Sequence, residues 1–255
     1  MGEDIEMKNA NDLKIPLIIS VAGHIDLAVP ESVLQRYFTE FWQALREKFG
    51  PSTPFVLLSS LAAGADHLAV KYRPADVPYC AVLPFAQEIY EKDFTGSALA
   101  DFRSDLRGAF KTVVCSGEPG DYAVAADYTR TQADIIITLW DGMETLDKNG
   151  NASRGGTYYT VRKVLQPDKL LSSSKEKAHL LVNFPVVRRK TYHGNEKKIF
   201  ESSSWGTLTA DETTGGIRFT PGLFFPPDTE IAGNAGNIRK YNGSLQDRRD
   251  ERNHL

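Results

Sequence analysis

A short run of small and charged residues suited to holding an anion lies at Arg154-Gly155-Gly156-Thr157. It follows the apolar stretch Asp134–Trp140 after a polar loop, and it opens the helix-like stretch Tyr158–Leu165. Glycine lets a backbone approach a ligand closely, and the free N–H groups at a helix start point at an anion. Thr157 adds a hydroxyl donor and Arg154 a positive charge. The run predicts a phosphate loop, although a glycine turn with a threonine cap explains it equally well when it is taken alone.

Two further groups with chemical potential follow other apolar stretches of the sequence. Gly23, His24 and Asp26 come directly after the first such stretch, and Gly64-Ala65-Asp66-His67 follows the second. Glycine again permits close approach to a ligand, while the histidine and carboxyl side chains could bind it or exchange protons with it. The alternative interpretation is structural, with His24 and Asp26 as turn residues and Asp66 as an ordinary acid in the first turn of a helix.

Arg130 is a further candidate, since it lies just before Asp134–Trp140 on a predicted helix and could supply a second positive charge. The alternative is a solvated charge on the helix surface. The acidic group Glu88, Glu91 and Asp93 is interpreted as a solvated loop. Cys80 and Cys115 are interpreted as buried reduced thiols, because their spacing matches neither a disulfide framework nor a zinc site. No metal ligands and no catalytic residues are assigned.

Apolar strands alternate with amphipathic helices over most of the chain, which predicts an α/β fold. Continuous apolar runs are typical of parallel strands buried on both faces, and right-handed crossovers place helices on both faces of a mainly parallel sheet. In such a sheet, ligands bind beyond the carboxyl ends of the strands, which is where the candidate residues lie. The predicted strands are Pro16–Ala22, Phe55–Leu58, Pro78–Leu83, Lys111–Cys115, Asp134–Trp140 and Ala178–Val187. The predicted helices run from Pro30 to Gly50 and over Ala65–Tyr72, Ser97–Phe110, Tyr122–Gln132 and Tyr158–Leu165.

Composition bounds the class of protein and its partners. The formal net charge of −3 argues against a general electrostatic grip on nucleic acid. There is no signal-peptide pattern and no apolar run long enough to span a membrane, so a cytoplasmic protein is expected. Residues 1–14 are predicted to be a flexible leader and 15–190 the nucleotide-binding domain. Residues 191–237 are expected to form an irregular extension packed on or beside the domain, with a hairpin near Ile217–Thr220. A charged helical tail is expected over 238–255.

Taken in order, these residues resemble the SLOG superfamily of Rossmann-like domains. That group includes the DNA-processing protein A family, the Lonely Guy hydrolases and the N-terminal domains of TRPM channels. The matching elements are Val21-Ala22-Gly23-His24, the stretch Ser59–Ala69 with Gly64 and Asp66, and Ile135–Trp140 followed by Gly155-Gly156-Thr157. The resemblance covers roughly residues 15–187 and implies a Rossmann-like three-layer fold. It also implies a nucleotide-derived, phosphate-bearing ligand bound across the strand ends.

Within that superfamily three functions remain open. A ligand sensor of the kind found in bacterial defence or signalling systems needs the phosphate loop but no catalytic acid. It would act through an effector domain or protein, and relatives commonly form homo-oligomers. A nucleotide N-glycosidase would need a glutamate where Thr160 stands here, leaving Asp66, His67 or Glu144 as candidates. A single-stranded DNA binder would use the basic run Arg188-Arg189-Lys190, against the acidic balance of the chain. The sensor is the preferred interpretation.

Overall fold

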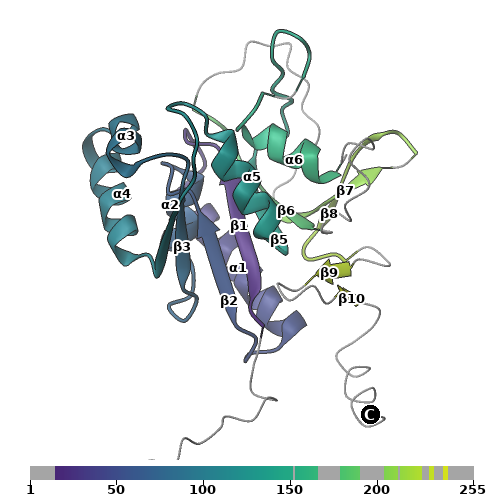
Figure 1. Cartoon of the computed structure of the whole chain (residues 1–255). Helices are drawn as coiled ribbons and strands as arrows, with labels where there is room; N and C mark the ends of the chain where they lie inside the picture. Colours follow the sequence, from purple (N-terminus) through teal and green to yellow (C-terminus); the bar gives the residue numbers. More distant parts are fainter. Residues whose placement is uncertain are drawn as a thin grey trace, which may run out of the picture.

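The computed structural model describes residues 15–151, 153–165, 179–189, 204–211, 213–225, 230–232 and 238–240. Within these ranges an eight-stranded sheet has the order β4-β3-β2-β1-β5-β6-β7-β8 (Figure 1). Its first six strands are parallel to their neighbours, and β7 and β8 are added antiparallel at one side. The strands are β1 Leu17–Gly23, β2 Phe55–Ser59, β3 Tyr79–Leu83, β4 Lys111–Val114, β5 Ile135–Trp140, β6 Leu180–Pro185, β7 Gly206–Asp211 and β8 Gly216–Pro221.

Helices cover both faces of the sheet and enclose two apolar cores. One core packs α1, α2 and α4 against the strands, and the other packs α5 and α6. In Figure 1, α5 and α6 cross the front of the sheet. The helices are α1 Glu31–Phe49, α2 Ala65–Lys71, α3 Gln87–Tyr90, η2 Glu91–Asp93, α4 Gly96–Gly108, α5 Ala123–Gln132 and α6 Thr157–Leu165. The predicted α/β, Rossmann-like three-layer fold with a mainly parallel sheet is therefore confirmed.

The longest helix shows how the sequence pattern produces this packing. Along α1, apolar residues recur three or four positions apart and form one stripe that is buried against the sheet. Phe38 and Phe41 in this stripe pack edge-on against Phe184 of β6. Trp205, which precedes β7, packs on Phe41 and Phe184 as well. This contact ties the antiparallel strands to the same core as the parallel ones.

Two expectations about the C-terminal third are corrected by the structure. The segment 191–237 was expected to be an irregular extension, but β7 and β8 pair with β6 and complete the main sheet. The predicted hairpin strand near Ile217–Thr220 is confirmed as part of β8. Positions 238–240, expected to begin a helical tail, form strand β10 (Ile238–Lys240), antiparallel to β9 (Glu230–Ala232). The remainder of that tail and the expected leader, 1–14, lie outside the described residues.

The order of the strands singles out one position at the carboxyl edge of the sheet. The chain builds β1 to β4 outward in one direction and then returns to place β5 on the other side of β1. The connections after β1 and β5 therefore diverge to opposite faces, which is the geometry at which open α/β sheets bind ligands. Among the described residues, none of the helices has the length and apolar character needed to cross a bilayer.

Candidate functional site

Three ionisable side chains from three neighbouring strand ends meet at this switch point. His24 follows β1, Asp141 follows β5, and Arg188 lies three residues beyond β6. The His24 Nε2 atom lies 3.1 Å from Asp141 Oδ1, and the Arg188 Nε donates to Asp141 Oδ2 at 2.8 Å. The sequence analysis selected His24 as a ligand residue, named Arg188 only within a basic run suited to single-stranded DNA, and did not select Asp141. Asp141 directly follows the buried strand β5, which is a signal in the sequence, whereas its meeting with the other two residues depends on the strand order.

Asp141 is the buried centre of this group, with only 3% of its side chain exposed. Burial by itself raises the pKa of the carboxyl. The contact with His24, the backbone N–H of Met143 at 3.1 Å and the charge of Arg188 outweigh that effect and hold the pKa of Asp141 below its usual value. The carboxylate therefore stays ionised and orients both neighbours.

Two buried polar atoms at the end of β1 have no hydrogen-bond partner among the described residues. They are His24 Nε2 and Asp26 Oδ2. The His24 side chain is only 10% exposed. Its Nε2 is close enough to Asp141 for an ion pair, but the two groups are not aligned for a hydrogen bond. Buried polar groups in folded proteins are normally satisfied, and exceptions gather at functional sites. These two atoms therefore mark the end of β1 as a candidate part of the site, although both are buried and His24 Nε2 lies against Asp141.

Gly23 and Gly64 are required where α2 approaches β1. A Cβ on Gly23 would lie 2.3 Å from the Cβ of Ala65, and one on Gly64 would lie 2.6 Å from the carbonyl oxygen of His24. Gly64 also has a φ of 73°, which disfavours other residues. Close backbone packing therefore accounts for both glycines, and it places the start of α2 beside His24.

Asp66 braces the loop between β2 and α2 from inside. Its Oδ1 accepts hydrogen bonds from Ser59 Oγ at 3.0 Å and from the N–H of Ser60 at 2.8 Å. Burial raises the pKa of this carboxyl to about 6, although these hydrogen bonds oppose the shift. Leu61 in the same loop has a φ of 57°. Asp66 thus fixes a strained loop at the site. Its Oδ1 already accepts two hydrogen bonds within that loop.

The predicted phosphate loop lies at the start of α6, which begins at Thr157. Gly155 has a φ of 78°, and a Cβ on it would lie 3.2 Å from the backbone nitrogen of Ala123, the first residue of α5. Two helices therefore begin side by side at this edge. Arg154 is exposed, with Nη2 3.9 Å from Asp121 Oδ1, so its charge stands near the loop without a tight ion pair.

Arg130 pairs within its own helix. α5 leads from the carboxyl end of β4 to the amino end of β5, and Arg130 lies in its last turn. Its Nη2 lies 3.4 Å from Asp127 Oδ1, and Tyr159 of α6 donates to the same carboxylate. Asp127 thus connects Arg130 to the first turn of α6.

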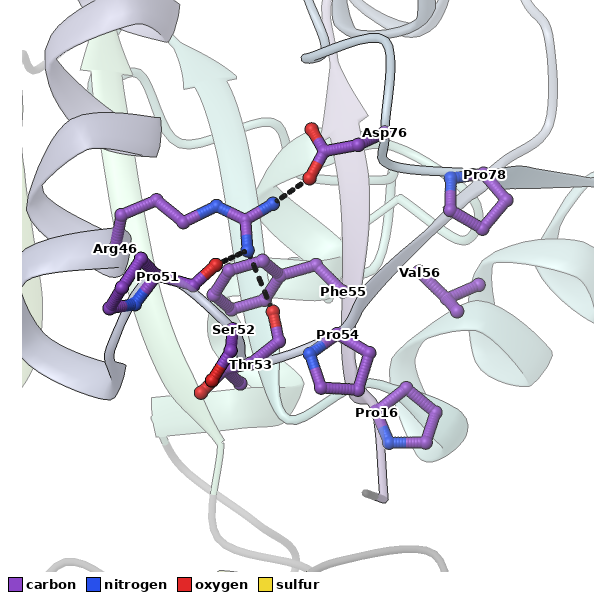
Figure 2. A pocket seen from close by; sticks show the side chains of 10 residues that line it. All are labelled: Pro16, Arg46, Pro51, Ser52, Thr53, Pro54, Phe55, Val56, Asp76 and Pro78. Carbon is purple, nitrogen blue, oxygen red and sulfur yellow. Dashed lines mark hydrogen bonds and ion pairs between the residues drawn. The ribbon is translucent and has the colours of Figure 1, made fainter. Parts of the chain in front are cut away.

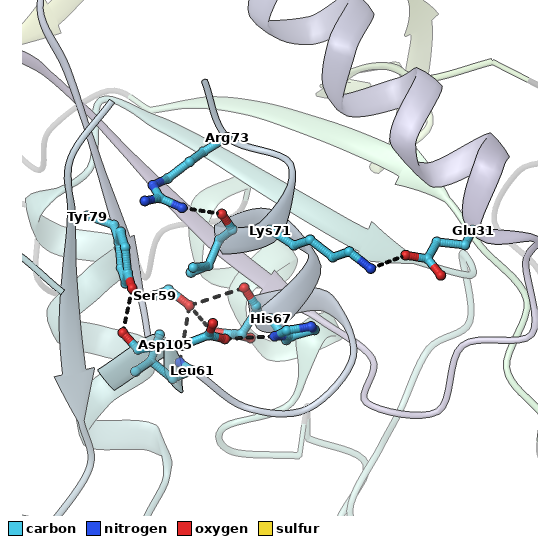
Figure 3. Close-up of polar contacts among 10 residues, drawn as sticks. Glu31, Ser59, Leu61, His67, Lys71, Arg73, Tyr79 and Asp105 are labelled. Carbon is cyan, nitrogen blue, oxygen red and sulfur yellow. Dashed lines mark hydrogen bonds and ion pairs between the residues drawn. The ribbon is translucent and has the colours of Figure 1, made fainter. Parts of the chain in front are cut away.

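His67, a candidate for catalysis, is held by a neighbouring helix. Its Nδ1 lies 2.7 Å from Asp105 Oδ2 of α4, and this hydrogen bond raises the pKa of His67 (Figure 3). Glu144 is exposed in the loop between β5 and α6, and Thr160 is buried in α6. In the part of the chain that the structure describes, no group of three or more potential metal ligands comes together.

A hollow of about 530 Å³ lies at the opposite, amino edge of the sheet, beside Pro54, Pro78 and the start of β1 (Figure 2). Arg46 on its wall donates to the carbonyl oxygens of Pro51 and Thr53 and pairs with Asp76 at 2.5 Å. The charged group in this hollow is already satisfied, and no candidate residue from the sequence analysis lies there. No protein-family model matches this chain, and no curated protein matches it.

Proposed function

We propose that this chain is a SLOG-like sensor that binds a nucleotide-derived, phosphate-bearing ligand at the carboxyl edge of its sheet. The observation that carries the proposal is the placement of Gly155-Gly156-Thr157 at the start of α6, directly against the start of α5. Two adjacent helix starts favour an anion, and glycine leaves room for it. In this structure the N–H of Gly156 donates to the carbonyl oxygen of Ser153 at 3.2 Å.

The charges around the loop support the same ligand. Arg154 is exposed beside the loop and can move onto a phosphate, because its present contact with Asp121 is long and solvent-exposed. Across the switch point, His24 and Asp26 each carry a buried polar atom without a hydrogen-bond partner among the described residues, and these side chains could bond to the sugar of a nucleotide. Gly23 and Gly64 keep the backbone beside them free of side chains.

Sensing is favoured over hydrolysis by the state of the acidic candidates. Thr160 stands where the related hydrolases carry a glutamate, and Glu144 is exposed in the preceding loop. Asp66 already serves as an acceptor within its own loop, and His67 is bound to Asp105. We therefore infer that the ligand is bound and reported, through an effector domain or protein, without being consumed.

A nucleotide N-glycosidase is the second candidate, and the His24–Asp141 contact favours it. An imidazole oriented by an ionised carboxylate can transfer protons in a reaction at the switch point. A single-stranded DNA binder has less support, because Arg188 is engaged with Asp141 and Arg189 donates to the carbonyl oxygen of Leu27. Both arginines of the basic run are thus occupied within the fold.

The test is a thermal-shift screen against mononucleotides, NAD-derived cyclic species and cyclic dinucleotides, repeated on Gly156→Asp. A sensor is stabilised by a nucleotide that chromatography recovers intact, and Gly156→Asp loses that stabilisation. Release of free base or ribose phosphate would instead identify an enzyme. A salt-dependent shift with an oligonucleotide would identify a DNA binder. If no nucleotide raises the melting temperature of the wild-type protein, the proposal fails.

A further inference from the structure

A block of aromatic side chains lies under the loop that follows β3, and its outermost ring is Tyr122. Tyr90 is at the centre of the block, with ring centroids 5.1 Å from Phe94 and 5.5 Å from both Phe85 and Phe102. Tyr122 packs on this block at 5.7 Å from Phe85 and 6.4 Å from Tyr90. The inner four rings are buried, whereas Tyr122 is 44% exposed.

The exposed ring is held in one orientation from both ends. Its ring packs at a tilt on Phe85 and Tyr90, with interplanar angles of 53° and 52°, and its hydroxyl donates to Asp93 Oδ2 at 2.9 Å. A flat apolar side chain that is already immobilised loses little conformational entropy when a second ring stacks on it. A merely solvent-facing tyrosine needs neither the aromatic support nor the carboxylate partner, so the arrangement fits a prepared stacking surface.

Tyr122 also stands in the right place for a ligand at the phosphate loop. It immediately precedes α5, and a Cβ on Gly155 would lie 3.5 Å from the Cβ of Tyr122. On its other side, the supporting Tyr90 donates through its hydroxyl to the carbonyl oxygen of Ser60, in the loop that Asp66 braces. The ring therefore lies between the phosphate loop and the end of β2.

We propose that Tyr122 is the stacking platform for the base of the bound nucleotide, so that the ligand is a nucleoside phosphate and not a bare sugar phosphate. This inference rests on the proposed function, because Gly155-Gly156-Thr157 must hold the phosphate. Stacking on an aromatic side chain tolerates every base, since each base has a flat face, and it favours the larger purines. Tyr122 thus determines specificity for the presence of a base.

The test compares AMP, GMP, CMP and UMP with ribose 5-phosphate, which lacks only the base. Affinities are measured by isothermal titration calorimetry on the wild-type protein, Tyr122→Ala and Tyr122→Phe. The matched control is Tyr128→Ala, which removes a tyrosine of similar exposure, 37%, from the same helix. Circular dichroism and the melting temperature of each variant confirm that it is folded.

The wild-type protein is expected to bind the purine nucleotides more tightly than ribose 5-phosphate. Tyr122→Ala should weaken nucleotide binding about 5- to 150-fold and leave ribose 5-phosphate unchanged. Tyr122→Phe should retain most of the affinity, because it keeps the ring and loses only the bond to Asp93. Tyr128→Ala should bind like the wild type.

Two results overturn the inference in distinguishable ways. If ribose 5-phosphate binds as tightly as AMP, or if Tyr122→Ala binds AMP like the wild type, Tyr122 is no platform. The phosphate loop then still stands, provided that Gly156→Asp abolishes the binding that remains. If neither the nucleotides nor ribose 5-phosphate bind the wild-type protein, the inference fails. The proposed function fails with it when the NAD-derived cyclic species and cyclic dinucleotides also leave the melting temperature unchanged.

Discussion

The two edges of the sheet differ in how deeply their ion pairs are buried. At the amino edge, Arg46 is engaged by two carbonyl oxygens and by Asp76, whose side chain is 69% exposed. At the carboxyl edge, Asp141 is buried with only 3% of its side chain exposed, and it lies between His24 and Arg188. The hollow beside Arg46 lies at the amino edge, away from this buried cluster.

This contrast teaches that a hollow and a group of residues able to do chemistry need not lie in the same place. The hollow beside Arg46 is lined by prolines and a fully paired arginine, which give a ligand little to bind. The carboxyl edge holds a strained loop and a buried ion cluster, and such features cost stability and are typical of functional sites. The predictions below compare matched changes at the two edges.

The largest difference is expected between two glycines with positive φ. Gly64 at the carboxyl edge has φ 73°, and Gly50 at the amino edge has φ 90°. Alanine at either position should cost about 1–3 kcal/mol through backbone strain. Gly64→Ala should cost about 1–3 kcal/mol more, because its Cβ would also overlap the carbonyl oxygens of His24 and Ile25 at 2.6 and 2.7 Å, whereas nothing lies within 4 Å at Gly50.

Urea unfolding of the two glycine variants measures these losses directly. Equal losses would show that the approach of α2 to β1 is less tight than the structure indicates.

The second difference is expected between two aspartates that pair with arginine. Asp141→Asn removes the charge that holds His24 and the partly exposed Arg188, and should lower the free energy of unfolding by about 2–3 kcal/mol. Asp76→Asn at the amino edge should cost about 0–1 kcal/mol, because its ion pair with Arg46 is largely solvated. Chemical denaturation near pH 7 measures both. A larger loss for Asp76→Asn would contradict the proposed contrast between the edges.

The third difference concerns the pH dependence of stability. Burial raises the pKa of Asp66 from about 4 to about 6 in the folded protein. Between these values Asp66 is protonated when folded and ionised when unfolded, so stability falls as pH rises. From pH 4.5 to 7 the wild-type protein should lose about 2 kcal/mol relative to Asp66→Asn, which keeps an acceptor at this position.

Urea unfolding at several pH values compares these stabilities, with Asp76→Asn as the control expected to follow the wild type. Parallel curves for wild type and Asp66→Asn would show that Asp66 is not buried as the structure has it.

Most of the sheet and its helices could be predicted because their patterns are local. The buried strand Ile135–Trp140 and the stripe of α1 each show their period within a few residues. The strands β7 and β8 could not be assigned to the main sheet, since their apolar stretches are short and their pairing with β6 depends on distant residues. The helical expectation for 238–240 rested on charged residues compatible with a helix, which pairing with β9 overrode.

His24 could be selected from the sequence because it directly follows a strand. The meeting of His24, Asp141 and Arg188 could not be predicted, because it depends on the order of strands β1, β5 and β6. Arg130 is close to β5 in sequence, but its contact with Asp127 depends on the turn of α5 and could not be read from that closeness. Tyr122 gave no signal of its own, since its role depends on rings from three other segments.

The most direct test of the central claim is nucleotide affinity measured by calorimetry on the wild-type protein, Gly156→Asp and Gly150→Asp. Gly156 immediately precedes α6, where aspartate is a favourable cap that offsets the 3.3 Å approach of its Cβ to the carbonyl oxygen of Ser153, so Gly156→Asp should fold about as stably as the wild type. Its carboxylate should nevertheless abolish nucleotide binding by repelling the phosphate. Gly150→Asp adds the same charge in the preceding loop, with nothing within 4 Å and at a φ of 77° that aspartate tolerates better than most residues, and should bind like the wild type. Unchanged affinity of a well-folded Gly156→Asp, or no binding of any nucleotide to the wild-type protein, would contradict a phosphate site at this edge.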